Sequence, residues 1–156
     1  MPNFVMWIGI AVAGLAFAAF GSLVIRNALA GRPTNLGLVL GRLRPCPASP
    51  NCVCSQESDR EHGIEPLAFS GTPDDAIAKL KRTINDIPRT NIVTDKGDYL
   101  HVEFTTRLMR FVDDVEFSVD PHNKVIHFRS ASRIGYSDLG TNRRRMEEVR
   151  TAFNQK

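Results

Sequence analysis

The N-terminal 25 residues carry no charged side chain, and this apolar stretch constrains the chain more than any other feature of the sequence. From Phe4 to Ile25 it runs for 22 mostly apolar residues. At about 1.5 Å per residue, a helix of that length crosses a hydrocarbon core of about 30 Å. Trp7 lies near one end, where an indole ring suits the lipid–water interface. The pattern predicts a membrane-spanning helix over residues 1–26.

A cleaved signal peptide is the competing interpretation of the same stretch. The tripeptides AFA (16–18) and ALA (28–30) each have the small residues of a cleavage site. Signal peptides, however, begin with a basic segment, and no Lys or Arg precedes this apolar run. We therefore expect an uncleaved span, then a linker over residues 27–45 and a globular domain over residues 46–156.

The basic charge of the chain is concentrated beside the apolar stretch. Residues 1–45 hold four arginines and no acidic residue, so of the 20 basic and 17 acidic residues in the chain, 16 basic and all 17 acidic ones follow residue 45. Nucleic-acid-binding domains have a clustered basic face, so this balance indicates no nucleic-acid partner. Positive charge beside a span tends to stay cytoplasmic, which taken alone would place the globular domain inside the cell.

Three cysteines lie close together in the segment RPCPASPNCVCSQ (44–56). The spacing of Cys46, Cys52 and Cys54, with His62 downstream, departs from the paired pattern of zinc sites, so we expect no metal. A disulfide between Cys46 and Cys52 is sterically possible, because the proline-rich loop between them must turn back on itself, and it requires an oxidising compartment. Three reduced cysteines in a cytosolic loop are the alternative, consistent with the position of the arginines.

Hydrophobic periodicity predicts helices and strands in an order that defines the fold class. Over residues 71–88, Thr72 is a suitable helix N-cap, Pro73 fits the first helical position and Pro88 ends the pattern. The other expected elements are strands over 91–95, 98–105, 111–120 and 124–132 and a helix over 139–153. We therefore expect an α+β protein, with an N-terminal transmembrane helix followed by a two-layer domain of antiparallel strands and two packed helices.

Strand alternation gives Asp113 the same parity as the apolar residues of the segment 111–120. Its carboxylate should therefore face the apolar layer, where it must be paired or protonated. A structural ion pair is a commoner role for such a group than acid catalysis. The candidate partners are Arg107, Arg129 and Arg133.

Asp114 and Glu116 have the opposite parity and should lie on the other face of the sheet. The neighbouring strand contributes Tyr99, His101 and Glu103 to the same face. These groups could form a functional surface of carboxylates and one imidazole. The solvated face of an antiparallel sheet explains the pattern equally well.

The segment RSASRIGYSDLGTNRRR (129–145) gathers arginines, hydroxyls and an acid between the last strand and the last helix. Arginines beside hydroxyls at a helix N-terminus suit an anionic group such as phosphate or carboxylate. The alternative, which the balanced charge favours, is that Arg129 and Arg133 neutralise carboxylates inside the fold. The candidate ligand-binding residues are Arg107, Asp113, Asp114, Arg129, Ser130, Ser132, Arg133, Tyr136, Asp138 and Asn142. The sequence has no Ser–His–Asp order, glycine-rich phosphate loop or H-E-x-x-H helix, so it assigns no catalytic residue.

Four separated stretches are similar to motifs of one known family. They are CPASPNCVCSQ (46–56), HGIEPL (62–67), DYLHVEFTTRLMRFVDDVEF (98–117) and RSASRIGYSDLGTNRRRMEEVR (129–150). In this order, and over most of the chain from about Leu36, the sequence resembles the bacterial and plastid family known as domain of unknown function 1499. The resemblance implies an extracytoplasmic domain and a disulfide between Cys46 and Cys52, which occupy the two cysteine positions of the family motif. Cys54 departs from the pattern, which has serine there, and the family implies no activity.

We therefore expect a single-pass protein of the inner membrane whose domain faces the periplasm, with no cofactor. The leading hypothesis is a non-enzymatic binding or accessory module whose partner is an anionic small molecule or another envelope protein. Its site would be the segment 129–142 with Arg107, Asp113 and Asp114. One alternative is an envelope enzyme that acts on an anionic or lipid-derived substrate through a carboxylate such as Asp114 or Glu103. The other is a scaffold for envelope proteins.

Overall fold

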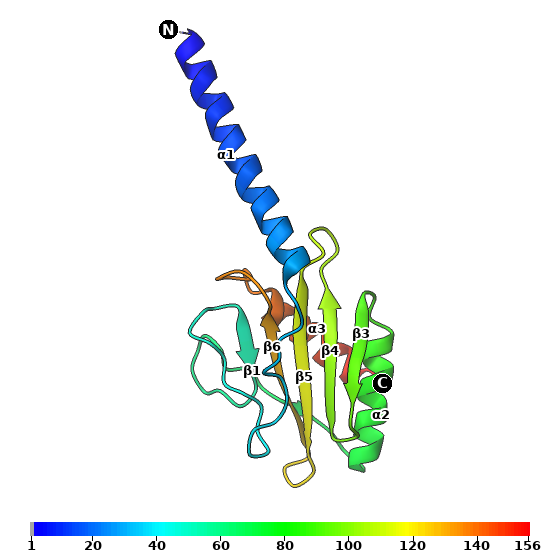
Figure 1. Cartoon of the computed structure of the whole chain (residues 1–156). Coiled ribbons are helices and arrows are strands. Elements are labelled where there is room, and N and C mark those ends of the chain that lie inside the picture. The colour runs from blue at the N-terminus through cyan, green and yellow to red at the C-terminus, as the bar shows by residue number, and fades with distance from the viewer. Residues whose placement is uncertain (1) are drawn as a thin grey trace. The chain divides into compact units, whose positions relative to one another are not determined.

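The computed structural model describes residues 2–156, which divide into compact units over residues 2–32 and 33–156. The first unit is dominated by helix α1 (Pro2–Leu29) (Figure 1). Its stretch Met6–Asn27 has 22 residues with a mean hydropathy of 2.3, which corresponds to about 33 Å of helix. By its length and composition, this helix can cross a membrane.

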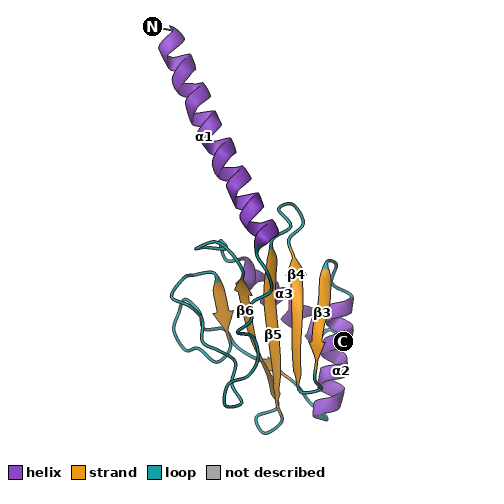
Figure 2. Cartoon of the chain, in the orientation of Figure 1, coloured by secondary structure: helices purple, strands orange, loops and turns teal. Residues whose placement is uncertain are grey.

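The second unit is built on one antiparallel sheet (Figure 2). The strand order is β1-β6-β5-β4-β3, and β2 pairs with the opposite end of β6 from β1. The three longest strands are consecutive and form hairpins, so neighbouring residues of β4, β5 and β6 lie in register. The strands are β1 (Cys52–Cys54), β2 (Leu67–Ala68), β3 (Thr90–Asp95), β4 (Tyr99–Thr105), β5 (Val112–Asp120) and β6 (Val125–Ser132).

Helices α2 (Pro73–Asn85) and α3 (Thr141–Asn154) cover one face of this sheet (Figure 1). Helix α2 begins as its sequence predicts, because Thr72 Oγ1 accepts a hydrogen bond from the Asp75 N–H at 3.1 Å and a proline follows the cap. The pattern predicted for strands and helices agrees with the structure, and the α+β fold is confirmed. The short strands β1 and β2 were not predicted.

The main core lies between the sheet and the two helices. Alternate residues of each central strand face the helices, so one apolar side chain in two is removed from water. Burial of each large side chain contributes about 1.5–3 kcal/mol, which makes this layer the chief source of stability. Its fully buried members include Leu80, Ile84, Leu100, Val102, Val115, Phe117, Ile126, Phe128, Met146, Val149 and Phe153.

Residues 33–51, which we call the covering segment, cross the opposite face of the sheet over β5 and β6 (Figure 1). The N–H of Gly37 donates to Oε1 of Glu116 on β5 at 2.6 Å, and Leu43 is only 5% exposed. The expectation of a solvated face is therefore wrong: His101, Asp114 and Glu116 are buried. The part of the expected linker (27–45) that follows Arg32 packs on the domain, since its apolar Leu43 joins a second cluster with Cys54 and Tyr99.

Candidate functional site

The polar residues of β5 point to opposite faces of the sheet and therefore belong to two separate clusters. Asp113 faces the helices, and Asp114 and Glu116 face the covering segment. The candidate residues that the sequence grouped as one site are divided by the sheet. Each cluster has its own partners and its own chemistry.

On the helix face, Asp113 forms an ion pair with Arg145 of α3. The expected partners Arg107, Arg129 and Arg133 were wrong, because the first turns of α3 run over this end of β5 and bring Arg145 to the carboxylate. The Arg145 guanidinium also donates to Asn142 Oδ1 at 2.6 Å and lies 5.2 Å from the ring of Phe104. This pair fixes α3 on the sheet.

Asn142 is the centre of the same cluster and has no exposed surface. Its Oδ1 accepts from Ser130 Oγ at 2.6 Å, and its Nδ2 donates to Ser132 Oγ at 3.0 Å and to the carbonyl of Asn51 at 2.9 Å. Every polar atom of this amide is used, so its role is to join β6, α3 and the residues before β1.

On the covering face, Arg133 holds two carboxylates. It donates to both oxygens of Asp114, at 2.7 and 2.8 Å, and to Glu103 Oε1 at 2.5 Å. His101 Nε2 lies 2.7 Å from Asp114 Oδ1. Burial alone would raise the pKa of Asp114, but the hydrogen bonds from Arg133 and His101 hold it below its usual range. Asp114 is therefore an ionised structural group at neutral pH.

Glu116 is the second buried carboxylate on this face. Besides the N–H of Gly37, it accepts the Tyr99 hydroxyl at 2.8 Å, and Arg129 Nη1 lies 3.5 Å away. Burial and the bond to Glu116 raise the pKa of Tyr99, so the phenol stays neutral and acts as a donor. Within residues 2–156, the Nε of Arg129 is a buried side-chain nitrogen without a hydrogen-bond partner.

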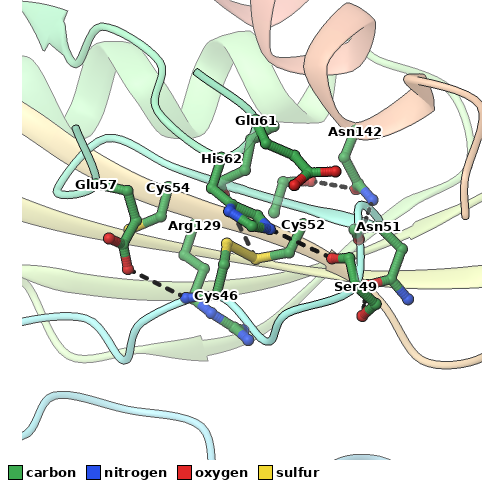
Figure 3. The surroundings of a disulfide bond; sticks show 12 residues. Cys46, Ser49, Asn51, Cys52, Cys54, Glu57, Glu61, His62, Arg129 and Asn142 are labelled. Atoms are coloured by element: carbon green, nitrogen blue, oxygen red, sulfur yellow. Dashed lines mark hydrogen bonds between the residues drawn. A yellow bond between two sulfur atoms is a disulfide. The ribbon is translucent and has the colours of Figure 1, made fainter. Parts of the chain in front are cut away.

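The disulfide joins Cys46 to Cys52 at the start of β1 (Figure 3). It ties the covering segment to the sheet, and the Cys46 N–H donates to Glu57 Oε1 at 3.3 Å. Two of the three cysteines are thereby unavailable as metal ligands. Cys54 is buried with a free thiol, and burial raises the pKa of that thiol. His62 bonds instead to Asp59, with Nδ1 and Oδ1 3.1 Å apart.

Three further candidates lie outside the side-chain networks of both clusters. Arg107 and Tyr136 are exposed in loops. Asp138 caps α3, because its carboxylate accepts the N–H groups of Gly140 at 2.9 Å and Asn142 at 2.7 Å. The N-terminus of α3 is thus already occupied by the chain itself.

A Ser–His–Asp arrangement that the sequence order did not reveal lies at the start of β6. Ser55 Oγ is 3.2 Å from His127 Nδ1, and His127 Nε2 is 3.8 Å from Asp120 Oδ2. The Ser55 hydroxyl also accepts the N–H of Phe128 at 2.9 Å, while the Ser55 N–H donates to the Phe128 carbonyl. Ser55 therefore continues the pairing of β1 with β6, and the His127–Asp120 distance is too long for a catalytic hydrogen bond.

The strongest candidate site is a groove of about 510 Å³ between the end of α2, the β4–β5 loop and α3. Four arginines line it against two acids, one of which, Asp86, pairs with Lys156. Apolar groups form the rest of the wall, including Phe104, Pro88 and Val149. The arginines are Arg89, Arg107, Arg144 and Arg145. Its volume is typical of small-molecule sites.

Only Arg107 of this groove was named from the sequence. The other arginines come from a turn and a helix more than 15 residues away in either direction, and no local motif connects them. A second groove, of about 600 Å³, is lined by four carboxylates against one arginine, and the carboxylates include Glu57, Asp59 and Glu147. It therefore suits an anion poorly.

Comparison with protein families matches residues 42–153 to the family described as "Protein of unknown function (DUF1499)". The match includes both clusters, the disulfide and all four arginines of the groove. No curated protein and no solved structure matches the chain.

Proposed function

The chain belongs to the DUF1499 family, which brings no activity with it, and from the geometry of its own domain we propose that it is a membrane-anchored binding module for a small anion with an apolar part. The ligand class is an organic phosphate or carboxylate. The site is the groove between α2, the β4–β5 loop and α3.

One observation carries this proposal: four arginines surround a groove whose other walls are largely apolar. Guanidinium groups bind phosphate and carboxylate in pairs of parallel hydrogen bonds, and they stay charged at any physiological pH. The lining stays positive, because Arg145 pairs with Asp113 and Asp86 with Lys156, which leaves three arginines against Glu148. The apolar wall of Phe104 and Val149 favours a ligand that also has hydrocarbon to bury.

For the location, we propose a single span in the inner membrane and a periplasmic domain. The length and composition of α1 support the span. The disulfide supports an oxidising compartment for the domain. Arg26 and Arg32 beside the span argue for the opposite orientation. We give the disulfide more weight, because a stable disulfide in the cytoplasm is rare whereas the charge bias is only statistical.

We do not extend the proposal to catalysis. The carboxylates expected to serve an enzyme, Asp114 and Glu103, are both bonded to Arg133, and the lowered pKa of Asp114 disfavours its use as a general acid. No particular observation favours a scaffold.

The test uses full-length protein in detergent micelles, titrated with phenyl phosphate and followed by isothermal calorimetry. We expect binding that weakens roughly tenfold or more with each of Arg107→Gln and Arg144→Gln, because each removes a charged hydrogen-bond donor. The control is Arg60→Gln with Lys96→Gln, which removes two positive charges outside the groove.

Inorganic phosphate serves as a second probe and should bind more weakly than phenyl phosphate, since it lacks the apolar part. The proposal fails if phenyl phosphate does not bind, or if the control pair weakens it as much as the groove variants do.

A further inference from the structure

Several loops of the domain gather at one end of the sheet because its strands are antiparallel. β3 and β5 begin at this end, and β4 and β6 finish there. It therefore holds the turn before β3, the β4–β5 loop (106–111) and the β6–α3 loop (133–140). We call it the loop end.

Exposed apolar side chains project from two loops of the loop end. Leu108 is 88% exposed, Tyr136 75% and Leu139 83%. Single exposed leucines are ordinary on a protein surface, but here two leucines and a tyrosine stand on the tips of neighbouring loops, not on a packed face. Such a group indicates a surface that is covered in the working protein.

Arginines accompany these apolar tips. Arg107 and Arg110 flank Leu108 in the β4–β5 loop, and Arg144 lies one turn into α3. Among the nearby carboxylates, Asp138 caps α3 and Asp86 pairs with Lys156, while Glu148 lines the groove with Arg107 and Arg144. Leucine, tyrosine and arginine together are the composition of the lipid–water interface, where apolar groups enter the acyl boundary and cations meet phosphate headgroups.

Only a short stretch of chain joins α1 to the compact domain. The compact domain starts at Pro33, four residues after Leu29 ends α1, which allows at most about 14 Å of extended chain. From Gly37, bonded to Glu116, the covering segment continues to Leu43, whose N–H bonds to Gln56 Oε1. Gln56 follows Ser55, whose N–H bonds to the carbonyl of Phe128 on β6. The covering segment therefore runs away from the loop end (Figure 1). Within the domain, the covering segment thus begins on the loop-end side of Gly37.

We propose that the loop end docks on the bilayer that holds α1, with Leu108, Tyr136 and Leu139 in the interfacial layer and Arg107, Arg110 and Arg144 at anionic headgroups. The inference rests on the proposed membrane span of α1. It does not depend on a ligand in the groove.

The test uses full-length protein in nanodiscs that contain anionic phosphatidylglycerol, with and without brominated acyl chains that quench indole fluorescence. Trp7 is the single tryptophan of the chain and lies in α1, so the unmodified protein reports whether α1 is inserted. Trp7→Phe with Leu139→Trp reports on the loop end. Trp7→Phe with Leu40→Trp is the matched control, because Leu40 is also exposed and also has a positive φ, 51° against 54°.

We expect strong quenching for the Leu139→Trp variant and little for the Leu40→Trp variant. Each arginine near an anionic surface contributes roughly fivefold to the binding constant, so Arg107→Gln with Arg110→Gln should weaken docking roughly 30-fold and reduce the quenching. Arg60→Gln with Lys96→Gln should leave it unchanged.

Equal quenching of the two leucine variants while Trp7 is quenched would overturn the docking and leave the span intact. Absence of Trp7 quenching would overturn both. A blue-shifted indole in the Leu139→Trp variant that bromine does not quench would mean that a protein, not lipid, covers the loop end, and this too overturns the proposal.

Discussion

Replacing Arg133 by methionine should be the most damaging single change to the polar side of the sheet. The Arg133 side chain is 9% exposed, and it is bonded to Asp114, which is 2% exposed, and to Glu103. Methionine keeps much of the aliphatic volume but removes all three hydrogen bonds. The carboxylates of Asp114 and Glu103 then lose their shared arginine, and Asp114 keeps its contact with His101.

The expected loss of unfolding free energy is about 3–5 kcal/mol, the cost of leaving a buried charge uncompensated. This is a large share of the roughly 5–15 kcal/mol that holds a domain together. An exposed pair behaves differently: Lys81→Met breaks the pair with Asp95, whose side chains are 31% and 42% exposed, and should cost about 1 kcal/mol or less.

The assay is urea unfolding of the full-length protein in micelles, followed by circular dichroism and tyrosine fluorescence. Asp114→Asn in the Arg133→Met background removes one stranded charge, so the double variant should be less destabilised than the two single changes added together. If Arg133→Met costs no more than Lys81→Met, the reasoning is wrong and water reaches this cluster freely.

Two further predictions follow from the cysteines and from His127. In protein purified from its own membrane, alkylation after denaturation should modify one cysteine, and three modified cysteines would contradict the disulfide. Alkylation of the native protein should be slow, because Cys54 is buried and its pKa is raised. Burial lowers the pKa of His127 below its unfolded value of about 6.5, so its contribution to stability is complete above that pH and is lost as the pH falls toward the folded-state pKa. His127→Gln should therefore reduce the difference in urea midpoint between pH 7.5 and pH 5. An unchanged difference would contradict this prediction.

The sequence predicted the helix face of the domain well, because the residues on that face recur at the regular spacing of strands and helices. The parity of Asp113 with Val115 and Phe117 placed its carboxylate toward the helices, where the structure has it. Its partner could not be chosen in the same way. Arg145 reaches Asp113 only because of how α3 crosses the sheet. Residues 143–145 are all arginines and point in different directions around the helix, so the sequence does not show which of them would pair with Asp113.

The covering face was mispredicted for a different reason. Asp114 and Glu116 follow the alternation of a solvated strand, and the segment that buries them has no periodicity of its own. Its contacts with the sheet are made by isolated residues: the Gly37 N–H donates to Glu116, and Leu43 packs with Cys54 and Tyr99. The groove is equally invisible in the sequence, because its arginines converge from the ends of three elements.

The covering segment also determines how the domain would respond to a pulling force from its anchor. Tension on α1 reaches the domain through Pro33 and Gly37, and it acts on β5 in the middle of the sheet rather than on an edge strand. The segment would peel first and release Glu116. From Pro33 to Cys46 it can extend by at most about 45 Å. At that point the disulfide transfers the load to Cys52 at the start of β1, so the covalent crosslink limits how far the anchor can strip the sheet before a strand itself must yield.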